Sequence, residues 1–86
     1  MKVFSYVIKD ELGIHARPAG NLVKLVKSFP ETEITIEKGD RSVKATQLMK
    51  IMGMGIKCGD TVKFTFNGKN EEAAEEAIRE FMEANL

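Results

Sequence analysis

The feature that most constrains the fold of this chain is a change in the spacing of apolar residues along its 86 positions. In four short segments apolar and polar residues alternate, which is typical of half-buried strands. In two longer segments apolar residues recur every three or four positions, which is typical of helices with one buried face. Turn signals such as Gly39-Asp40 and Asn67-Gly68 separate these segments. The pattern predicts strands over residues 2–8, 33–38, 41–45 and 61–66, and helices over 16–29, 47–52 and 71–85.

The helix boundaries follow from residues with a known preference for helix ends. Pro18 falls in the first turn of the first helix, where the missing N–H is harmless, and Pro30 ends that helix. We expect Thr46 to cap the short helix and Asn70 to cap the last one. The resulting order, βαββαβα, predicts an α+β fold with a four-stranded antiparallel sheet. Two long helices and one short helix would cover one face of the sheet, and the other face would be open to water.

Composition narrows the class of protein. Residues 1–86 are expected to form a single domain, because 43% apolar residues suffice for one core. The single cysteine, Cys58, allows no internal disulfide, and one histidine with one cysteine makes a metal site improbable. No apolar run approaches the roughly 20 residues of a membrane span, and the first residues alternate like a strand rather than a signal peptide. Thirteen basic and thirteen acidic residues argue against nucleic acid as a partner. We therefore expect a cytoplasmic monomer.

The candidate functional segment is Gly13-Ile14-His15-Ala16-Arg17-Pro18-Ala19, which joins the first strand to the first helix. It contains the only histidine, and Arg17 lies in a first helical turn, where the backbone dipole disfavours a cation. The same dipole favours the neutral imidazole, which is a nucleophile. A phosphoryl group on His15 would lie against free backbone N–H groups, and Arg17 would pair with its charge. A helix cap or an ordinary loop histidine is the simpler alternative.

This segment resembles the active-site motif of the HPr family, the histidine-containing phosphocarriers of the phosphoenolpyruvate-dependent sugar phosphotransferase system. The resemblance covers the whole chain and implies an open-faced β-sandwich. It implies that His15 accepts a phosphoryl group at Nδ1 from phosphorylated enzyme I and passes it to the IIA domains of sugar transporters. Arg17 would assist the phosphate, and Ala16 and Pro18 would form the helix N-terminus beside it. The protein would be a carrier without a cofactor, and not itself an enzyme.

A second cluster, Leu48 to Met54, is rich in methionine and is either core or a docking surface. Ile51 and Met52 are the strongest core candidates from their positions, whereas Leu48 and Met49 could remain exposed. In HPr proteins the short helix joins the first long helix in one partner-binding face. The expected partner-binding residues are Gly20, Lys24, Leu48, Met49, Lys50, Met52 and Met54.

The family's regulatory serine is not found at the start of the short helix. That position is Gln47, or Thr46 one residue earlier, so a second phosphorylation is not expected. The altered position leaves open a regulatory HPr paralogue that acts mainly by docking to other proteins. A small α+β module that binds a metabolite or an anion is a third alternative, although a two-layer fold of this size leaves little room for a pocket.

Overall fold

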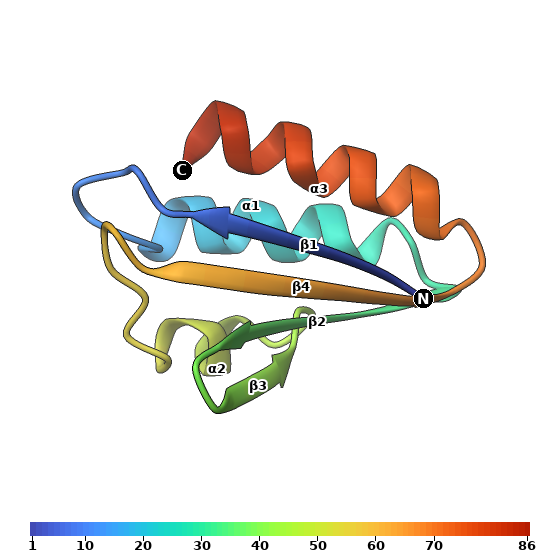
Figure 1. Cartoon of the computed structure of the whole chain (residues 1–86), viewed down its shortest axis with the longest axis horizontal. Helices are drawn as coiled ribbons and strands as arrows, with labels where there is room; N and C mark the ends of the chain where they lie inside the picture. The colour runs from blue at the N-terminus through green and yellow to red at the C-terminus, as the bar shows by residue number, and fades with distance from the viewer.

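The predicted order of elements is confirmed in the computed structural model, which describes residues 1–86 (Figure 1). Each predicted helix and strand is present, with boundaries shifted by two residues or fewer. The elements are β1 (Lys2–Val7), α1 (Ala16–Lys27), β2 (Thr32–Lys38), β3 (Arg41–Lys44), α2 (Leu48–Met52), β4 (Thr61–Gly68) and α3 (Glu71–Asn85).

The sheet is antiparallel throughout, with the strand order β1-β4-β2-β3. Phe64 in β4 lies opposite Phe4 of β1 on one side and Ile36 of β2 on the other. The rings of Phe4 and Phe64 are stacked, with centroids 6.2 Å apart. Because β4 is a central strand, its apolar side chains form the middle of the core.

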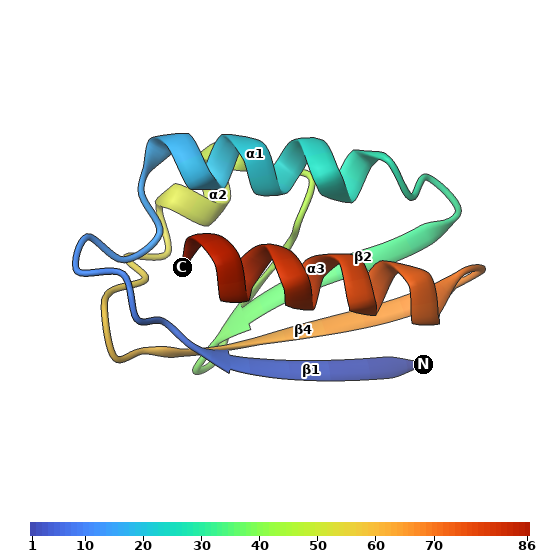
Figure 2. The same ribbon diagram turned by 90° about the horizontal axis from the view of Figure 1, so that it is seen from above.

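Helices α1 and α3 lie on the same side of the sheet, as Figure 2 shows. The apolar stripe of α1 is buried as its spacing predicts, and Leu22 is completely inaccessible to solvent. On α3 the stripe is formed by Ala74, Ile78 and Met82, all fully buried. The short helix α2 contacts α1 and buries Ile51. None of the three helices has the length and hydropathy needed to cross a bilayer.

The predicted cap position is correct for Asn70 and wrong by one residue for Thr46, and neither helix has a side-chain capping hydrogen bond. The residue before α2 is Gln47 and not Thr46, and its side chain makes no capping hydrogen bond. Asn70 does precede α3, but it has left-handed backbone (φ 62°) and its side chain is not the cap either. The Glu71 carboxylate instead accepts a hydrogen bond from the N–H of Gly68 (2.8 Å). Residue preferences predicted where these helices begin to within one residue, but they did not identify the group that binds the free backbone N–H groups there.

Candidate functional site

His15 occupies the position immediately before α1. Its backbone is extended (φ −108°, ψ 179°), its carbonyl accepts the first helical hydrogen bond from Ala19 (2.9 Å), and its ring makes no capping hydrogen bond. The side chain is 39% exposed. The imidazole is therefore not used to complete the helix, and it remains accessible to a partner.

The loop before His15 is held in place by Gly13. Gly13 has φ +68°, and a Cβ at this position would collide with the carbonyl oxygen of Ile56. The close approach lets Ile14 N–H donate to that same oxygen (3.1 Å), while the Ile14 side chain is buried. A side chain at position 13 would push the loop away from the segment before β4, so glycine is required here on steric grounds.

Asp10 is the nearest acidic group to the ring. Its Oδ2 lies 3.8 Å from Nε2 of His15, and its Oδ1 accepts a hydrogen bond from the N–H of Leu12 (2.8 Å). A carboxylate facing one ring nitrogen favours the proton on that nitrogen, which leaves the other nitrogen as the base or nucleophile. Nδ1 of His15 is the ring nitrogen that does not face this carboxylate.

The start of α1 offers unsatisfied donors beside the ring. The N–H groups of Ala16 and Arg17 belong to the first turn and have no helical partner, and Pro18 has no N–H. Arg17 is exposed and forms no ion pair with any carboxylate. The first turn also contains no acidic residue. An anion at this helix end would therefore meet two free amides and an unpaired guanidinium.

These groups line a shallow hollow of about 190 Å³. Its walls are Asp10, His15, Arg17, Pro18, Asn21 and Asn85. Asn21 and Asn85 were not predicted; they approach from the second turn of α1 and from the end of α3. Only the helical spacing between Arg17 and Asn21 could have indicated one of them. The structure shows no group of three or more His, Cys, Asp or Glu side chains arranged to hold a metal ion.

The predicted docking residues of the segment from Leu48 to Met54 are mostly at the surface, but one of them is buried. Met49 is 77% exposed, Met52 and Lys50 are also exposed, and Leu48 packs against the edge of the core. The expectation that Met54 is a surface residue is corrected: it is 5% exposed and belongs to the core. The expectation that Met52 belongs to the core together with Ile51 is also wrong, because Ile51 is buried and Met52 is exposed.

The remaining predicted docking residues lie on α1. Lys24 is exposed, and Gly20 is partly exposed with open space where a side chain would lie. Because α1 and α2 contact each other, we group these residues with Leu48, Met49, Lys50 and Met52 of α2 under the name α1–α2 face. It combines exposed apolar side chains with two lysines.

The β2–β3 hairpin holds the end of α2 in position. Lys38 donates to the carbonyl oxygen of Gly55 (2.9 Å) and pairs with Asp60 (2.9 Å), and Arg41 donates to the carbonyl oxygen of Gly53 (3.1 Å). The hydrogen bond from Lys38, followed by that from the N–H of Lys57, holds the pKa of Asp60 below its ordinary value. Cationic side chains thus satisfy carbonyl groups that follow the short helix.

Comparison with known proteins supports a family assignment. The model of the family described as "PTS HPr component phosphorylation site" matches residues 2–84. The phosphocarrier protein HPr of Mycoplasma genitalium is 36% identical over 87 residues, which cover 99% of this chain and 97% of that protein. A multiphosphoryl transfer protein of Salmonella typhimurium is 37% identical over 84 residues, but the chain spans only 22% of its length. The crystal structure of an HPr from Thermoanaerobacter tengcongensis superposes with a TM-score of 0.91 at 36% identity, covering 98% of this chain and 93% of that one.

Proposed function

Because this chain belongs to the HPr family of the phosphotransferase system and is a phosphocarrier, we propose that His15 is the residue that carries its phosphoryl group. The family model and the relatives named HPr extend over nearly the whole chain. The alternative of a paralogue that acts mainly by docking is not favoured.

One observation carries the proposal for His15. The only histidine of the chain stands before a helix whose first turn has free amides, an unpaired arginine and no carboxylate. A phosphoryl group adds negative charge and several acceptor oxygens, which suit this set of donors. The environment therefore complements the phosphorylated state of His15 better than the unmodified state.

The transfer step uses groups already in place. The lone pair of Nδ1 attacks the phosphorus of a phosphohistidine on the donor protein, a new P–N bond forms, and the donor's P–N bond breaks with its electron pair returning to the donor's ring. The Asp10 carboxylate, 3.8 Å from Nε2, favours the proton on that nitrogen and leaves Nδ1 as the nucleophile. Arg17 and the free amides stabilise the charge on the phosphoryl oxygens. The reverse step transfers the group to an acceptor.

The partners that we assign are phosphorylated enzyme I as donor and the IIA domains of sugar transporters as acceptors. The α1–α2 face supports this assignment, because its exposed apolar side chains lie next to lysines that attract acidic partners. In this scheme the chain receives its phosphoryl group from enzyme I and gives it up to an acceptor. It is therefore a substrate of enzyme I rather than a catalyst.

Incubation with radiolabelled phosphoenolpyruvate and enzyme I tests the proposal. The parent protein should acquire one acid-labile phosphate, and His15→Ala should acquire none while keeping the circular dichroism spectrum of the parent. Since the chain has one histidine, persistent labelling of His15→Ala would show that another residue accepts the phosphate.

A further inference from the structure

Leu12 is a large apolar side chain exposed to solvent three positions before His15. It lies in the loop between β1 and α1, which projects beyond the ends of the helices in both Figure 1 and Figure 2. Its side chain is 73% exposed, although most other leucines and isoleucines of the chain are buried. The other apolar side chains of this loop, Ile8 and Ile14, are buried in the core, whereas Leu12 lies outside it.

The loop presents Leu12 in a fixed position. The carboxylate of Asp10 accepts the N–H of Leu12 (2.8 Å), and the carbonyl oxygen of Asp10 accepts the N–H of Gly13 (2.9 Å). The N–H groups of Lys9 and Asp10 both donate to an oxygen of Leu86 (2.6 and 2.9 Å). A side chain held by a hydrogen-bonded turn loses little further freedom when a partner covers it.

The same carboxylate connects Leu12 to the reacting group. While one oxygen of Asp10 binds the amide of Leu12, the other faces Nε2 of His15 at 3.8 Å. The Cα atoms of residues 12 and 15 can be separated by at most about 11 Å. A protein interface of standard size buries about 800 Å² on each partner, which corresponds to a disc of about 16 Å radius. A donor centred on His15 therefore covers Leu12.

We propose that Leu12 is an apolar anchor for the phosphoryl donor, inserted into a hydrophobic recess beside the donor's phosphohistidine. The inference rests on the function proposed for His15 and extends its docking surface. Leu12 lies on the loop side of His15, whereas Met49 and Met52 lie on α2. An apolar contact on the loop, in addition to those on α2, would fix the orientation of the imidazole toward the incoming phosphorus better than the α1–α2 face alone.

The test measures the initial rate of phosphorylation by phosphorylated enzyme I as a function of the concentration of this protein. Leu12→Ala should raise KM about tenfold with kcat nearly unchanged, because it removes apolar surface that becomes buried only in the complex. Leu12→Met keeps an apolar side chain of similar volume, and its KM should stay within about twofold of the parent value. Val3→Ala is the matched control, because Val3 is 50% exposed but lies on β1, outside the loop before His15.

The outcomes separate this inference from the function on which it rests. An unchanged KM for Leu12→Ala, with His15 still labelled, would overturn the contact and leave the carrier function intact. A loss in kcat without a rise in KM would also overturn it, because the side chain would then act on the bound state only. If the parent protein is not labelled, both proposals fall. Thermal unfolding should give the same Tm for all three variants and the parent, which shows that KM is not altered through folding.

Discussion

The starts of α1 and α3 are built alike but serve different purposes. Each follows a glycine with positive φ, +68° at Gly13 and +137° at Gly68. In each case a Cβ would collide with a carbonyl oxygen, that of Ile56 or that of Glu31. Both helices therefore begin where the chain crosses another segment at a distance that only glycine permits.

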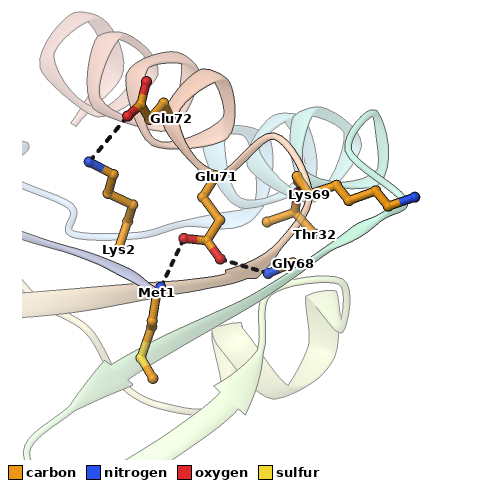
Figure 3. A network of polar contacts seen from close by, with 7 residues as sticks. All are labelled: Met1, Lys2, Thr32, Gly68, Lys69, Glu71 and Glu72. Atoms are coloured by element: carbon orange, nitrogen blue, oxygen red, sulfur yellow. Dashed lines mark hydrogen bonds and ion pairs between the residues drawn. The ribbon is translucent and has the colours of Figure 1, made fainter.

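The difference between the two ends lies in their charges. At α3 the first turn contains Glu71 and Glu72, and Glu71 binds the N–H of Gly68 (2.8 Å) and the amino group of Met1 (3.0 Å) (Figure 3). At α1 the first turn contains no carboxylate, and Arg17 occupies it instead. The positive end of α3 is thus neutralised from within the chain, whereas the first turn of α1 contains no such anion. An end that lacks its internal anion is the one to examine for function.

Giving the first turn of α1 a carboxylate, as the first turn of α3 has, should have the largest effect on phosphoryl transfer. Arg17→Glu places a carboxylate in the first turn of α1, as in α3. We expect phosphorylation by enzyme I to slow by roughly 10²–10³-fold, because a stabilising cation is replaced by a repelling anion. Folding stability should be unchanged or higher by about 0.3–1 kcal/mol, because the carboxylate suits the helix dipole. Transfer rates and denaturant unfolding of the same sample would show the two effects in opposite directions.

Arg17→Gln serves as the control, since it removes the cation without adding an anion and should slow transfer less. If Arg17→Glu is phosphorylated at the parent rate, the contrast between the two helix ends has no functional meaning.

The same substitution at Gly13 and at Gly68 should distinguish an effect on folding stability from an effect on phosphoryl transfer. Gly13→Ala and Gly68→Ala should each destabilise the fold by at least about 1–3 kcal/mol, the cost of a strained left-handed residue. Only Gly13→Ala should also slow transfer, because it shifts the loop that carries Asp10 and faces His15. Urea unfolding and phosphorylation rates, measured where both variants are still folded, give the comparison. Similar rates for the two variants would show that the geometry of this loop does not matter for transfer.

Removing the negative charge of Glu71 at the start of α3 should have the smallest effect, and it should change only folding stability. The hydrogen bond from Gly68, followed by the amino group of Met1, holds the pKa of Glu71 below its ordinary value of 4.5. A carboxyl group whose pKa is lowered by folding stabilises the protein above 4.5, and this contribution is lost as the pH falls through the lowered value. Glu71→Gln should therefore lower Tm by a few degrees at neutral pH, and the difference from the parent should close in acid. Its transfer rate should equal that of the parent; a slower rate would mean that the two ends are coupled.

Much of the fold could be predicted because its signals are periodic. The stripe containing Leu22 in α1 and the alternation around Phe64 in β4 each repeat over several turns or residue pairs, so a single misleading position cannot hide them. The site motif was equally clear, because it combined the only histidine with Arg17 in a place unfavourable for a cation. These signals depend only on residues close together in the sequence, so they can be recognised without knowing the tertiary structure.

The errors occur where burial depends on distant contacts. Met54 follows α2 in a glycine-rich loop with no period, and its burial depends on the tertiary position of that loop, which is bound by Lys38 and Arg41 of the β2–β3 hairpin. Met52 and Ile51 are neighbours on a helix of five residues, too short for spacing to decide which one faces inward. Asp10 lies five residues before His15, and only the loop closed by Gly13 brings the two side chains together. Leu12 gave one signal, since it is the only apolar residue between Lys9 and Gly13.

We propose that His15 carries the phosphoryl group on Nδ1, the ring nitrogen that does not face Asp10. Nitrogen and phosphorus NMR of histidine-labelled protein, phosphorylated with phosphoenolpyruvate and enzyme I, tests it directly because the chain has one imidazole ring. The prediction is a phosphorus resonance coupled to Nδ1, with Nε2 protonated. A phosphorus signal coupled to Nε2, or a phosphorylated protein whose imidazole resonances are unchanged, would contradict it.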